Sequence, residues 1–318
     1  MLSELKFVQG AVSTKDFVPE MKHFTIKDGR VTGFNGVLAL SSPIELDVSC
    51  APKAVPLVKA IGLCQDVVSL GLTEANRLRV KSGPFKVFVD CVELEGLPEQ
   101  QPSGEIIEFD GEQMLNAIKK LTPFIGSDAS RPWTNGILLR GQSAFATNNV
   151  CLVEYWIGTA LPFTVNVPIQ AIKEMSRISE PPVNAQLSEH SITFHYADGR
   201  WLRTQLYDTN WPDVAKILDQ NRTPTPAPEG LFEALHLLKP FLEMDGTIYF
   251  RGGSVYTTKD DNLGGSCEVE GLHPEGVYVH KMLSLLEGVA ESVDFTAYPE
   301  PLLFYGDRLR GVILGRRL

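Results

Sequence analysis

Two stretches of this chain repeat one another, and this repetition limits the folds that it can adopt. In each stretch, two predicted strands joined by a glycine turn lead into a short acidic tail that ends in proline and a carboxylate. The stretches cover residues 76–98 and 192–212, and their tails close with Leu97-Pro98-Glu99 and Trp211-Pro212-Asp213. The two prolines lie 114 residues apart in a chain of 318. A period of about one third of the length predicts repeated domains rather than one singular active site.

Two linkers divide the chain into three parts. Residues 98–104 carry turn-forming residues and show no apolar period. Residues 219–230 contain the run Thr223-Pro224-Thr225-Pro226-Ala227-Pro228, whose alternating prolines can neither continue a helix nor join the middle of a sheet. We therefore predict three domains, at residues 1–103, 104–220 and 221–318.

Each predicted domain repeats a smaller pattern, in which one helix is followed by three or four strands. The helix expected at 111–125 shows the helical period best, because Met114, Ile118 and Leu121 recur along one face. The strands alternate apolar and polar residues, as in 191–196, which favours antiparallel sheets with one buried face. The predicted fold class is α+β, with two helices and antiparallel sheets in each of three repeated domains. The other helices are expected at 2–12, 52–62, 169–178, 231–242 and 279–289.

The composition is that of an ordinary globular protein, with 43% hydrophobic and 21% charged residues. No run of about 18 apolar residues is present that would span a membrane. The five cysteines are scattered and form no CxxC pair, which predicts reduced thiols and a cytoplasmic location. A net charge of −10 argues against a nucleic-acid binder only if the charges are spread evenly. No nucleotide, zinc or nucleophile motif occurs, so we expect neither an enzyme nor a cofactor.

Basic residues recur on every predicted helix, whereas acidic residues gather in linkers and at strand ends. Lysines are common on solvated helix faces, and that simple explanation suffices for any one helix. Six helices in equivalent positions would nevertheless line one surface with positive charge, which suits a polyanion such as DNA. The basic residues on or next to the helices are Lys6, Lys15, Lys53, Lys59, Lys119, Lys120, Lys173, Arg177, Lys239, His280 and Lys281.

Three short segments point to a known family. Trp211-Pro212-Asp213 is followed by the mostly apolar residues 214–218. Asn135-Gly136 opens a predicted strand that leads to the turn Ala146-Thr147-Asn148-Asn149, and the chain ends in Arg317-Leu318. In this order, and within a three-domain layout, the segments resemble the bacterial DNA polymerase III beta sliding clamp. The resemblance covers nearly the whole chain in its layout and is close only in these places.

The resemblance implies that the chain forms half of a ring. Two subunits would form a homodimer head to tail, with residues 85–89 of one meeting residues 241–242 of the other. Twelve helices would face a hole through which duplex DNA passes, held by weak phosphate contacts that are indifferent to sequence. A DNA polymerase and a clamp loader are the implied protein partners. The residues carried over as DNA contacts are Lys15, Lys53, Lys59, Lys119, Lys120, Arg131, Trp133, Lys173, Arg177, Lys239 and Lys281.

A groove between the second and third domains is also implied, where the family docks short hydrophobic peptides of its partners. This chain departs from the family pattern at Asn149-Val150-Cys151-Leu152, where Gly-His-Arg-Leu is usual, and at Thr134, where an aliphatic residue is usual. The first domain also lacks its usual opening strand, and such shortening suggests a divergent, viral member. The expected groove residues are Thr134, Thr147, Leu152, Pro212, Ile217, Leu314, Arg316, Arg317 and Leu318.

Other interpretations of the same residues stay open at this point. His190 and His195 could form a metal pair, but their odd spacing on a strand sends the side chains to opposite faces. Asp208 and Asp213 could act as paired catalytic carboxylates, but they lie on the repeated tail, which favours a structural role. Trp133 could equally be a core aromatic. A viral structural or assembly protein of repeated β-rich domains is the alternative function.

Overall fold

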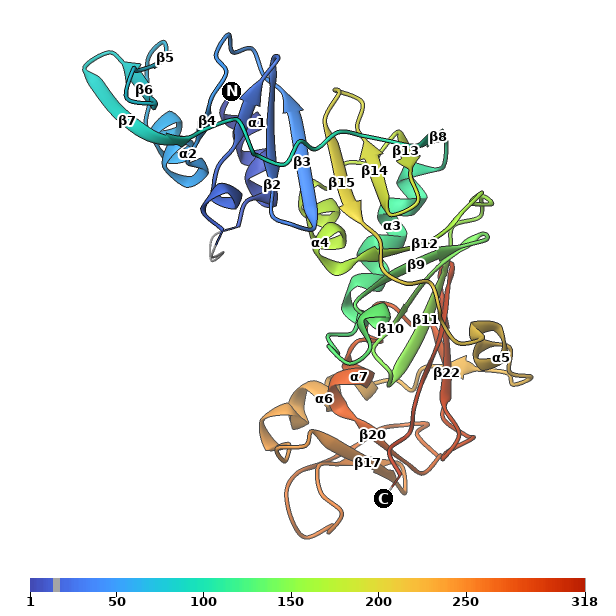
Figure 1. The fold of residues 1–318 in the computed structure, drawn as a ribbon. Helices are drawn as coiled ribbons and strands as arrows, with labels where there is room; N and C mark the ends of the chain where they lie inside the picture. Colours follow the sequence, from blue (N-terminus) through green and yellow to red (C-terminus); the bar gives the residue numbers. More distant parts are fainter. Residues whose placement is uncertain (14–17, 318) are drawn as a thin grey trace. The chain divides into compact units, whose positions relative to one another are not determined.

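The computed structural model describes residues 1–13 and 18–317. Two of the residues carried over from the resemblance, Lys15 and Leu318, lie outside this range. The chain divides into two compact units, each made of two segments (Figure 1). Unit 1 comprises Met1–Leu115 and Gln170–Leu206, and unit 2 comprises Asn116–Ile169 and Tyr207–Leu318. Within the described residues, no helix combines the length and apolar character needed to cross a membrane.

Unit 1 is built on a seven-stranded antiparallel sheet whose strands come from both of its segments. β3 pairs with β15 through Leu40 opposite Leu202 and Ser41 opposite Trp201, so blue and yellow strands lie side by side in Figure 1. This pairing carries one sheet across the boundary expected between the first two domains. The strand order is β1 (Thr25–Lys27), β2 (Arg30–Phe34), β3 (Leu38–Pro43), β15 (Trp201–Gln205), β14 (Ser191–His195), β13 (Asn184–Leu187) and β8 (Glu105–Ile107).

A second, four-stranded sheet in unit 1 leaves part of one strand unpaired. Residues 85–90 of β7 (Phe85–Val92) pair with β6 (Arg77–Ser82), which in turn pairs with β5 (Ser69–Leu72). On its other side, β7 meets β4 (Ala51–Pro52) at Cys91 and Val92, and the carbonyl of Asp90 accepts from the N–H of Lys53 (2.9 Å). In the described structure, residues 85–89 therefore form an open sheet edge. The helices α1 (Leu2–Val8) and α2 (Ala54–Gly62) pack against each other, and α1 covers β2 and β3.

Unit 2 repeats this plan with an eight-stranded sheet. Its strands also come from two segments, because β11 pairs with β23 through Leu152 opposite Val312 and Glu154 opposite Arg310. This second seam crosses the boundary expected between the second and third domains. The strand order is β12 (Thr164–Pro168), β9 (Gly136–Arg140), β10 (Ser143–Thr147), β11 (Cys151–Trp156), β23 (Leu309–Ile313), β22 (Leu302–Gly306), β21 (Ser292–Asp294) and β16 (Thr225–Pro226).

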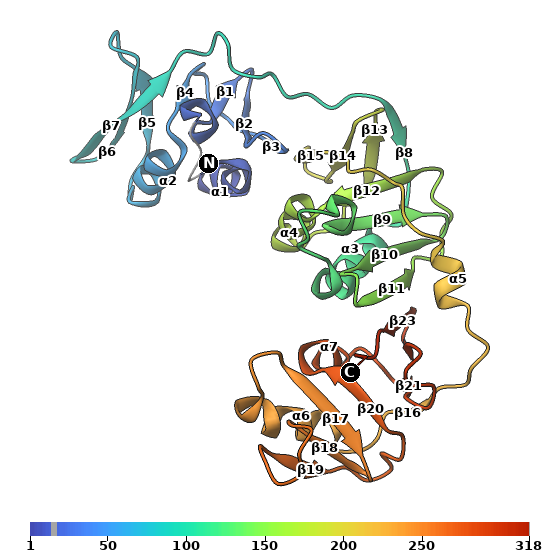
Figure 2. The ribbon, with the colours of Figure 1, turned by 60° about the horizontal axis from the view of Figure 1, so that its bottom comes forward.

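A four-stranded sheet completes unit 2, in the order β19 (Ser266–Glu268), β18 (Ser254–Tyr256), β17 (Thr247–Arg251) and β20 (Gly276–Val279). The helices α6 (Leu231–Leu238) and α7 (His280–Ser284) pack on this sheet and on each other (Figure 2). β19 pairs only with β18, so it is a second open edge of the described structure. The α+β fold class is confirmed, with helices and antiparallel sheets in each third of the chain; three domains with the predicted bounds remain a proposal.

All six helices expected from the sequence are present in the described structure, and all but one have altered ends. α4 (Ile169–Ile178) has the predicted bounds, and α3 (Gly111–Leu121) continues into a 3-10 turn at Thr122–Phe124. α2 begins two residues late because Pro52 belongs to β4. α7 ends at Ser284 rather than at 289, because Leu285 and Leu286 bond to the carbonyls three residues before them instead of four.

A seventh helix was not predicted. α5 (Val214–Leu218) follows the second repeated tail, whereas no helix follows the first. It starts at Asp213, whose carboxylate accepts a hydrogen bond from the backbone N–H of Lys216 (3.3 Å). An aspartate at this position satisfies one of the unpaired N–H groups of the first turn. The tail therefore positions a short helix.

Candidate DNA-facing helices and partner groove

The lysines carried over from the resemblance are accessible to solvent. In the described part of the chain, seven of them are exposed, and their ammonium groups form no ion pair or side-chain hydrogen bond. A solvated, unpaired ammonium group keeps its donors free for a phosphate oxygen. The helices α2, α3, α4, α6 and α7 each carry at least one of these lysines, either within the helix or next to its end. The seven are Lys53, Lys59, Lys119, Lys120, Lys173, Lys239 and Lys281.

Arg177 differs from these lysines because its guanidinium already makes contacts within the protein. Its Nε pairs with Glu174 (2.6 Å), and its Nη2 donates to the backbone carbonyl of Phe7 (2.7 Å). These contacts tie α4 to the end of α1 within unit 1. Arg177 is therefore a structural residue with spare donors, and we rank it below the lysines as a DNA contact.

Arg131 and Trp133 lie on the loop before β9 and differ in their exposure to solvent. Arg131 is exposed, and its Nη1 donates to the side chain of Asn149 (3.0 Å). Trp133 is half-buried, with its ring against Trp211 at a centroid distance of 5.2 Å and an interplanar angle of 62°. The indole therefore belongs partly to the core of unit 2, next to the second repeated tail.

Asn166 holds this region together, and sequence reasoning missed it. Its side chain is fully buried, and its Nδ2 donates to the carbonyls of Trp133 and Asp208, both at 2.9 Å. Its backbone carbonyl accepts from Tyr207. The only signal in the sequence was one polar residue inside an apolar strand. Through Asn166, the tail that leads to α5 is fixed to β12 and to the Trp133 loop.

Part of the set of residues expected to line the groove meets at an apolar core cluster where α5 packs on the eight-stranded sheet. Seven buried side chains form an apolar cluster here, and Leu152 belongs to it with an exposed fraction of only 5%. Ile217 lies at its half-buried rim, and Pro212 is exposed beside it. We call this surface the α5 groove. Its buried members are Leu138, Phe145, Leu152, Val214, Leu218, Leu303 and Val312, and its rim is Trp211, Ile217 and Tyr305.

Thr134 and Thr147 are buried, and their hydroxyl groups bond inside the protein. Thr134 donates to the carbonyl of Arg131 (2.9 Å), and Thr147 donates to the carbonyl of Cys151 (2.6 Å). The backbone N–H of Gly126 is shared between the carbonyls of the same two threonines. Both residues therefore shape the loops behind the α5 groove, rather than presenting side chains in it.

The turn at residues 148–151, which departs from the family pattern, is stabilised by hydrogen bonds of its own side chains. The side chain of Asn148 accepts hydrogen bonds from the N–H groups of Val150 and Cys151 (3.0 and 2.9 Å). Asn149 adopts a positive φ of 69°, which asparagine tolerates better than most residues. Burial raises the pKa of Cys151 to about 12, so its thiol is protonated and unreactive at neutral pH.

The C-terminal residues divide between exposed and structural roles. Leu314 is exposed, while its N–H bonds to the carbonyl of Val150 (2.8 Å). Arg316 pairs with Asp245 (2.7 Å), and its carbonyl accepts from the hydroxyl of Tyr298 (2.8 Å). Arg317 is exposed. Leu314 and Arg317 are therefore available to a partner, whereas Arg316 anchors the terminus.

The residues behind the enzyme interpretations have structural partners. His190 is exposed in a turn, and His195 contacts the amide oxygen of Gln186 (3.3 Å). No group of three histidine, cysteine or acidic side chains suited to a metal occurs among the residues described. Asp208 accepts from the N–H and side chain of Asn210, and Asp213 caps α5. The two aspartates thus have the structural role that the repeated tails indicated.

The fold is similar over the full chain to solved structures of known proteins. No family model and no curated protein matches the chain. Among solved structures, the beta subunit of DNA polymerase from Streptococcus pyogenes has a TM-score of 0.84 and 18% identity, with 100% of this chain and 97% of that chain covered. The beta sliding clamp of Caulobacter crescentus has a TM-score of 0.87 and 16% identity, with coverages of 100% and 96%. The sliding clamp of Bacillus subtilis has 0.84 and 15%, with coverages of 100% and 97%. The chain therefore has, over its full length, the fold of the bacterial DNA polymerase III beta sliding clamps.

Proposed function

We propose that this protein is a DNA sliding clamp, a non-catalytic processivity factor that encircles duplex DNA and tethers a polymerase. The observation that carries the proposal is the full-length structural match to sliding clamps, at TM-scores of 0.84 to 0.87. All five cysteines are free, which suits action in a reducing cytoplasm. A polymerase, a clamp loader and a second copy of the chain are the partners that this function requires.

The exposed helix lysines are the residues that we propose face DNA. Contacts to phosphate oxygens fix a protein on DNA without reading its sequence, and they weaken as salt rises. A closed ring stays on DNA by topology, so such contacts can remain few and weak. Seven unpaired ammonium groups on or beside the helices of an acidic protein, with net charge −10, suit that mode of binding.

Head-to-tail closure is supported first by two open sheet edges. Residues 85–89 of β7 and residues 266–268 of β19 lack a partner strand on one side in the described structure. An unpaired edge readily adds a strand from another chain. Apolar side chains lie near both edges, with Phe88 on β7 at 47% exposed and Phe241 after α6 at 61%. We propose that β7 of one subunit docks beside β19 of the other.

Opposite charges beside the two edges give the second argument. Arg79, Lys81 and Lys86 are exposed on β6 and β7, and none pairs with an acid in the part of unit 1 described. Beside β19, the exposed acidic residues are Asp260, Asp261, Glu268 and Glu270. Complementary potentials of this kind raise association rates and select the correct register. The β7 edge of one subunit is therefore better matched in charge to the β19 edge of another than to a second β7 edge, which favours head-to-tail over head-to-head contact.

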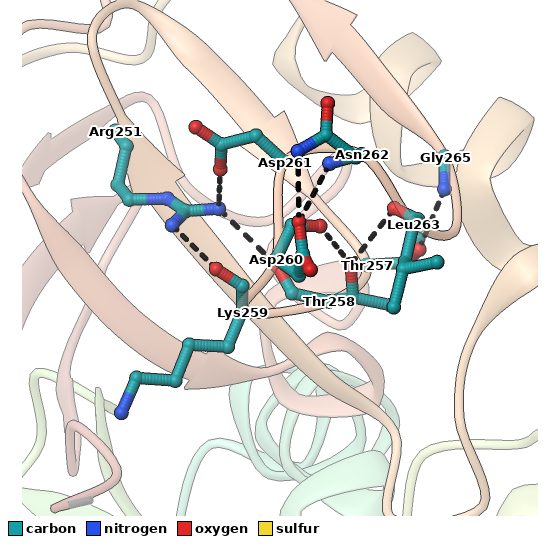
Figure 3. Close-up of polar contacts among 9 residues, drawn as sticks. All are labelled: Arg251, Thr257, Thr258, Lys259, Asp260, Asp261, Asn262, Leu263 and Gly265. Atoms are coloured by element: carbon teal, nitrogen blue, oxygen red, sulfur yellow. Dashed lines mark hydrogen bonds and ion pairs between the residues drawn. The ribbon is translucent and has the colours of Figure 1, made fainter.

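Internal hydrogen bonds hold the acidic loop before β19 in one shape (Figure 3). The hydroxyl of Thr258 lies 2.7 Å from the carbonyl oxygen of Asp260 and 2.8 Å from that of Leu263, and its single proton is shared between them. The carboxylate of Asp260 accepts from the N–H of Asn262 (2.9 Å), and Asp261 pairs with Arg251. A loop that is ordered before binding loses less entropy when a partner docks.

The α5 groove is the surface that we propose for peptides of the polymerase and clamp loader. It combines a buried apolar cluster, to which Leu152 belongs, with an accessible rim at Pro212 and Ile217. A peptide with apolar anchors would cover the two rim residues while its backbone sets the register. The substitution Ile217→Asp places a charge at this rim and should abolish peptide capture, without changing DNA retention.

The function is tested by loading the protein on circular duplex DNA and then linearising the DNA. A clamp remains on the circle and leaves through the free ends once the DNA is cut. Blocking both ends of the linear DNA with a bulky protein should restore retention. Equal retention on circular and open linear DNA would indicate ordinary binding and refute the proposal.

A further inference from the structure

The sheet face that carries the α5 groove continues beyond it along β11, β22 and β23. Leu152, Val312 and Leu303 lie opposite one another across these strands and belong to the buried cluster of the α5 groove. Two residues further along each strand, Glu154, Arg310 and Tyr305 form the next row. Trp156 and Arg308 follow in a third row, joined by a bond from the N–H of Trp156 to the carbonyl of Arg308 (2.8 Å).

A separate cavity of about 290 Å³ opens over this second and third row. Its lining consists of Glu154, Trp156, Tyr305, Arg308, Leu309 and Arg310. Tyr305 also belongs to the rim of the α5 groove, so the two surfaces are continuous. Trp156 lies four residues beyond Leu152, which is about 13 Å along an extended strand. An extended peptide in the groove would cover that distance with about four residues.

The aromatic wall of this cavity is accessible and held in place. The Trp156 side chain is 48% exposed, and its Nε1 donates to the amide oxygen of Gln142 (3.3 Å). The guanidinium of Arg308 lies 5.2 Å from the centre of the indole ring. Its Nη1 also donates to the carbonyl of Ile157 (3.3 Å). A large exposed indole beneath an arginine offers an apolar surface with a positive edge.

The two arginines of the cavity differ in their charge balance. Arg310 pairs with Glu154 (2.6 Å) and with Asp219 at the end of α5 (2.7 Å). Burial acts to lower the pKa of Arg310, but these hydrogen bonds outweigh it and raise the pKa. Arg308 has no acidic partner among the residues described, and it is exposed. Of the two arginines, Arg308 is therefore the one whose guanidinium is free of a carboxylate partner.

We propose that this cavity is a second subsite of the partner groove, which binds an acidic, aromatic flank of the docked peptide. The aromatic side chain would pack on Trp156, Tyr305 and Leu309, and a neighbouring carboxylate would pair with Arg308. Arginine holds carboxylates through two parallel N–H donors, which fixes the orientation of the flank. This inference rests on the proposed function, because the α5 groove must first hold the apolar part of the peptide.

The test measures peptide binding to the full chain by fluorescence anisotropy. One labelled peptide carries only apolar anchors, two leucines and a phenylalanine. Two longer peptides add four residues ending in tyrosine and aspartate, at the N-terminus or at the C-terminus. We expect one extension to tighten binding about tenfold, which is the size of a single favourable contact pair. Trp156→Thr and Arg308→Asn should each remove most of this gain and leave binding of the short peptide unchanged.

Controls separate this proposal from the proposed function. Ile217→Asp should abolish binding of the short peptide, and replacing the aspartate of the flank by lysine should remove the gain. No gain from either extension, or a gain that survives both cavity substitutions, would overturn the subsite. If the short peptide fails to bind while a long one binds through Trp156 and Arg308, the cavity binds peptide by itself, which overturns its role as a second subsite of the α5 groove. If no peptide binds, both fail, whereas retention on circular DNA still tests the clamp by itself.

Discussion

Replacing Asn166 by alanine should loosen unit 2 where the second tail leaves the sheet. The side chain is fully buried and donates two hydrogen bonds, to the carbonyls of Trp133 and Asp208. Each bond contributes about 1 kcal/mol net, and a carbonyl left buried without a donor costs about 1–3 kcal/mol. The side-chain oxygen of Asn166 has no partner itself, so its removal offsets part of this loss. We therefore expect unit 2 to lose about 2 kcal/mol of unfolding free energy.

Urea denaturation followed by tryptophan fluorescence measures this change, because Trp133 and Trp211 lie in contact next to Asn166. The matched control is Asn210→Ala in the same tail, where the side chain is exposed and bonds only to Asp208. That substitution should stay within about 0.5 kcal/mol of the parent protein. The Asn166 variant should also bind groove peptides more weakly, since α5 follows the released tail. Equal stability of the two variants would refute the role given to Asn166.

Three further predictions concern DNA, assembly and pH. Replacing Lys119, Lys120 and Lys173 by alanine should reduce the slope of log K against log salt for duplex DNA by about 0.9 for each true phosphate contact, and an unchanged slope would exclude these residues. Changing Arg79, Lys81 and Lys86 to glutamate should convert the proposed head-to-tail dimer, about twice 35.1 kDa, into monomers in sedimentation, and changing Asp260, Glu268 and Glu270 to lysine in the same chain should restore it. Burial lowers the pKa of His195, and the charge of Arg30 lowers it further, so the unfolded state binds the extra proton below about pH 6.5. The histidine therefore contributes stability above that pH which is lost as the pH falls, and in His195→Gln the difference in urea midpoint between pH 7.5 and pH 5 should shrink.

Local patterns in the sequence predicted the elements well. The apolar period around Met114, Ile118 and Leu121 marked α3, and α4 has the predicted bounds. In the second repeated tail, Asp213 caps α5, which agrees with the structural role expected for that tail. Such features depend on neighbours within a few residues, which a single sequence displays directly. The match to solved clamps then bears out the fold that the scattered motifs near Asn135 and Trp211 indicated.

The long-range features were not predictable in this way. The β3–β15 and β11–β23 seams join residues far apart in the chain, and no local period reports which strands meet. For the same reason, the sequence did not reveal that Thr134 and Thr147 bond internally, or that Arg177 is held by Glu174 and Phe7. A resemblance to a family predicts where in a turn or helix a residue lies, but it does not predict which groups that residue bonds to.

We propose that this protein holds DNA by enclosing it, with its helix lysines making only weak contacts. The lifetime of the loaded protein on circular duplex DNA at high salt, before and after a single cut, measures this directly. Enclosure should leave the lifetime on the circle nearly unchanged by salt, and cutting should shorten it sharply. A lifetime that falls with salt in the same way on intact and cut DNA would contradict it.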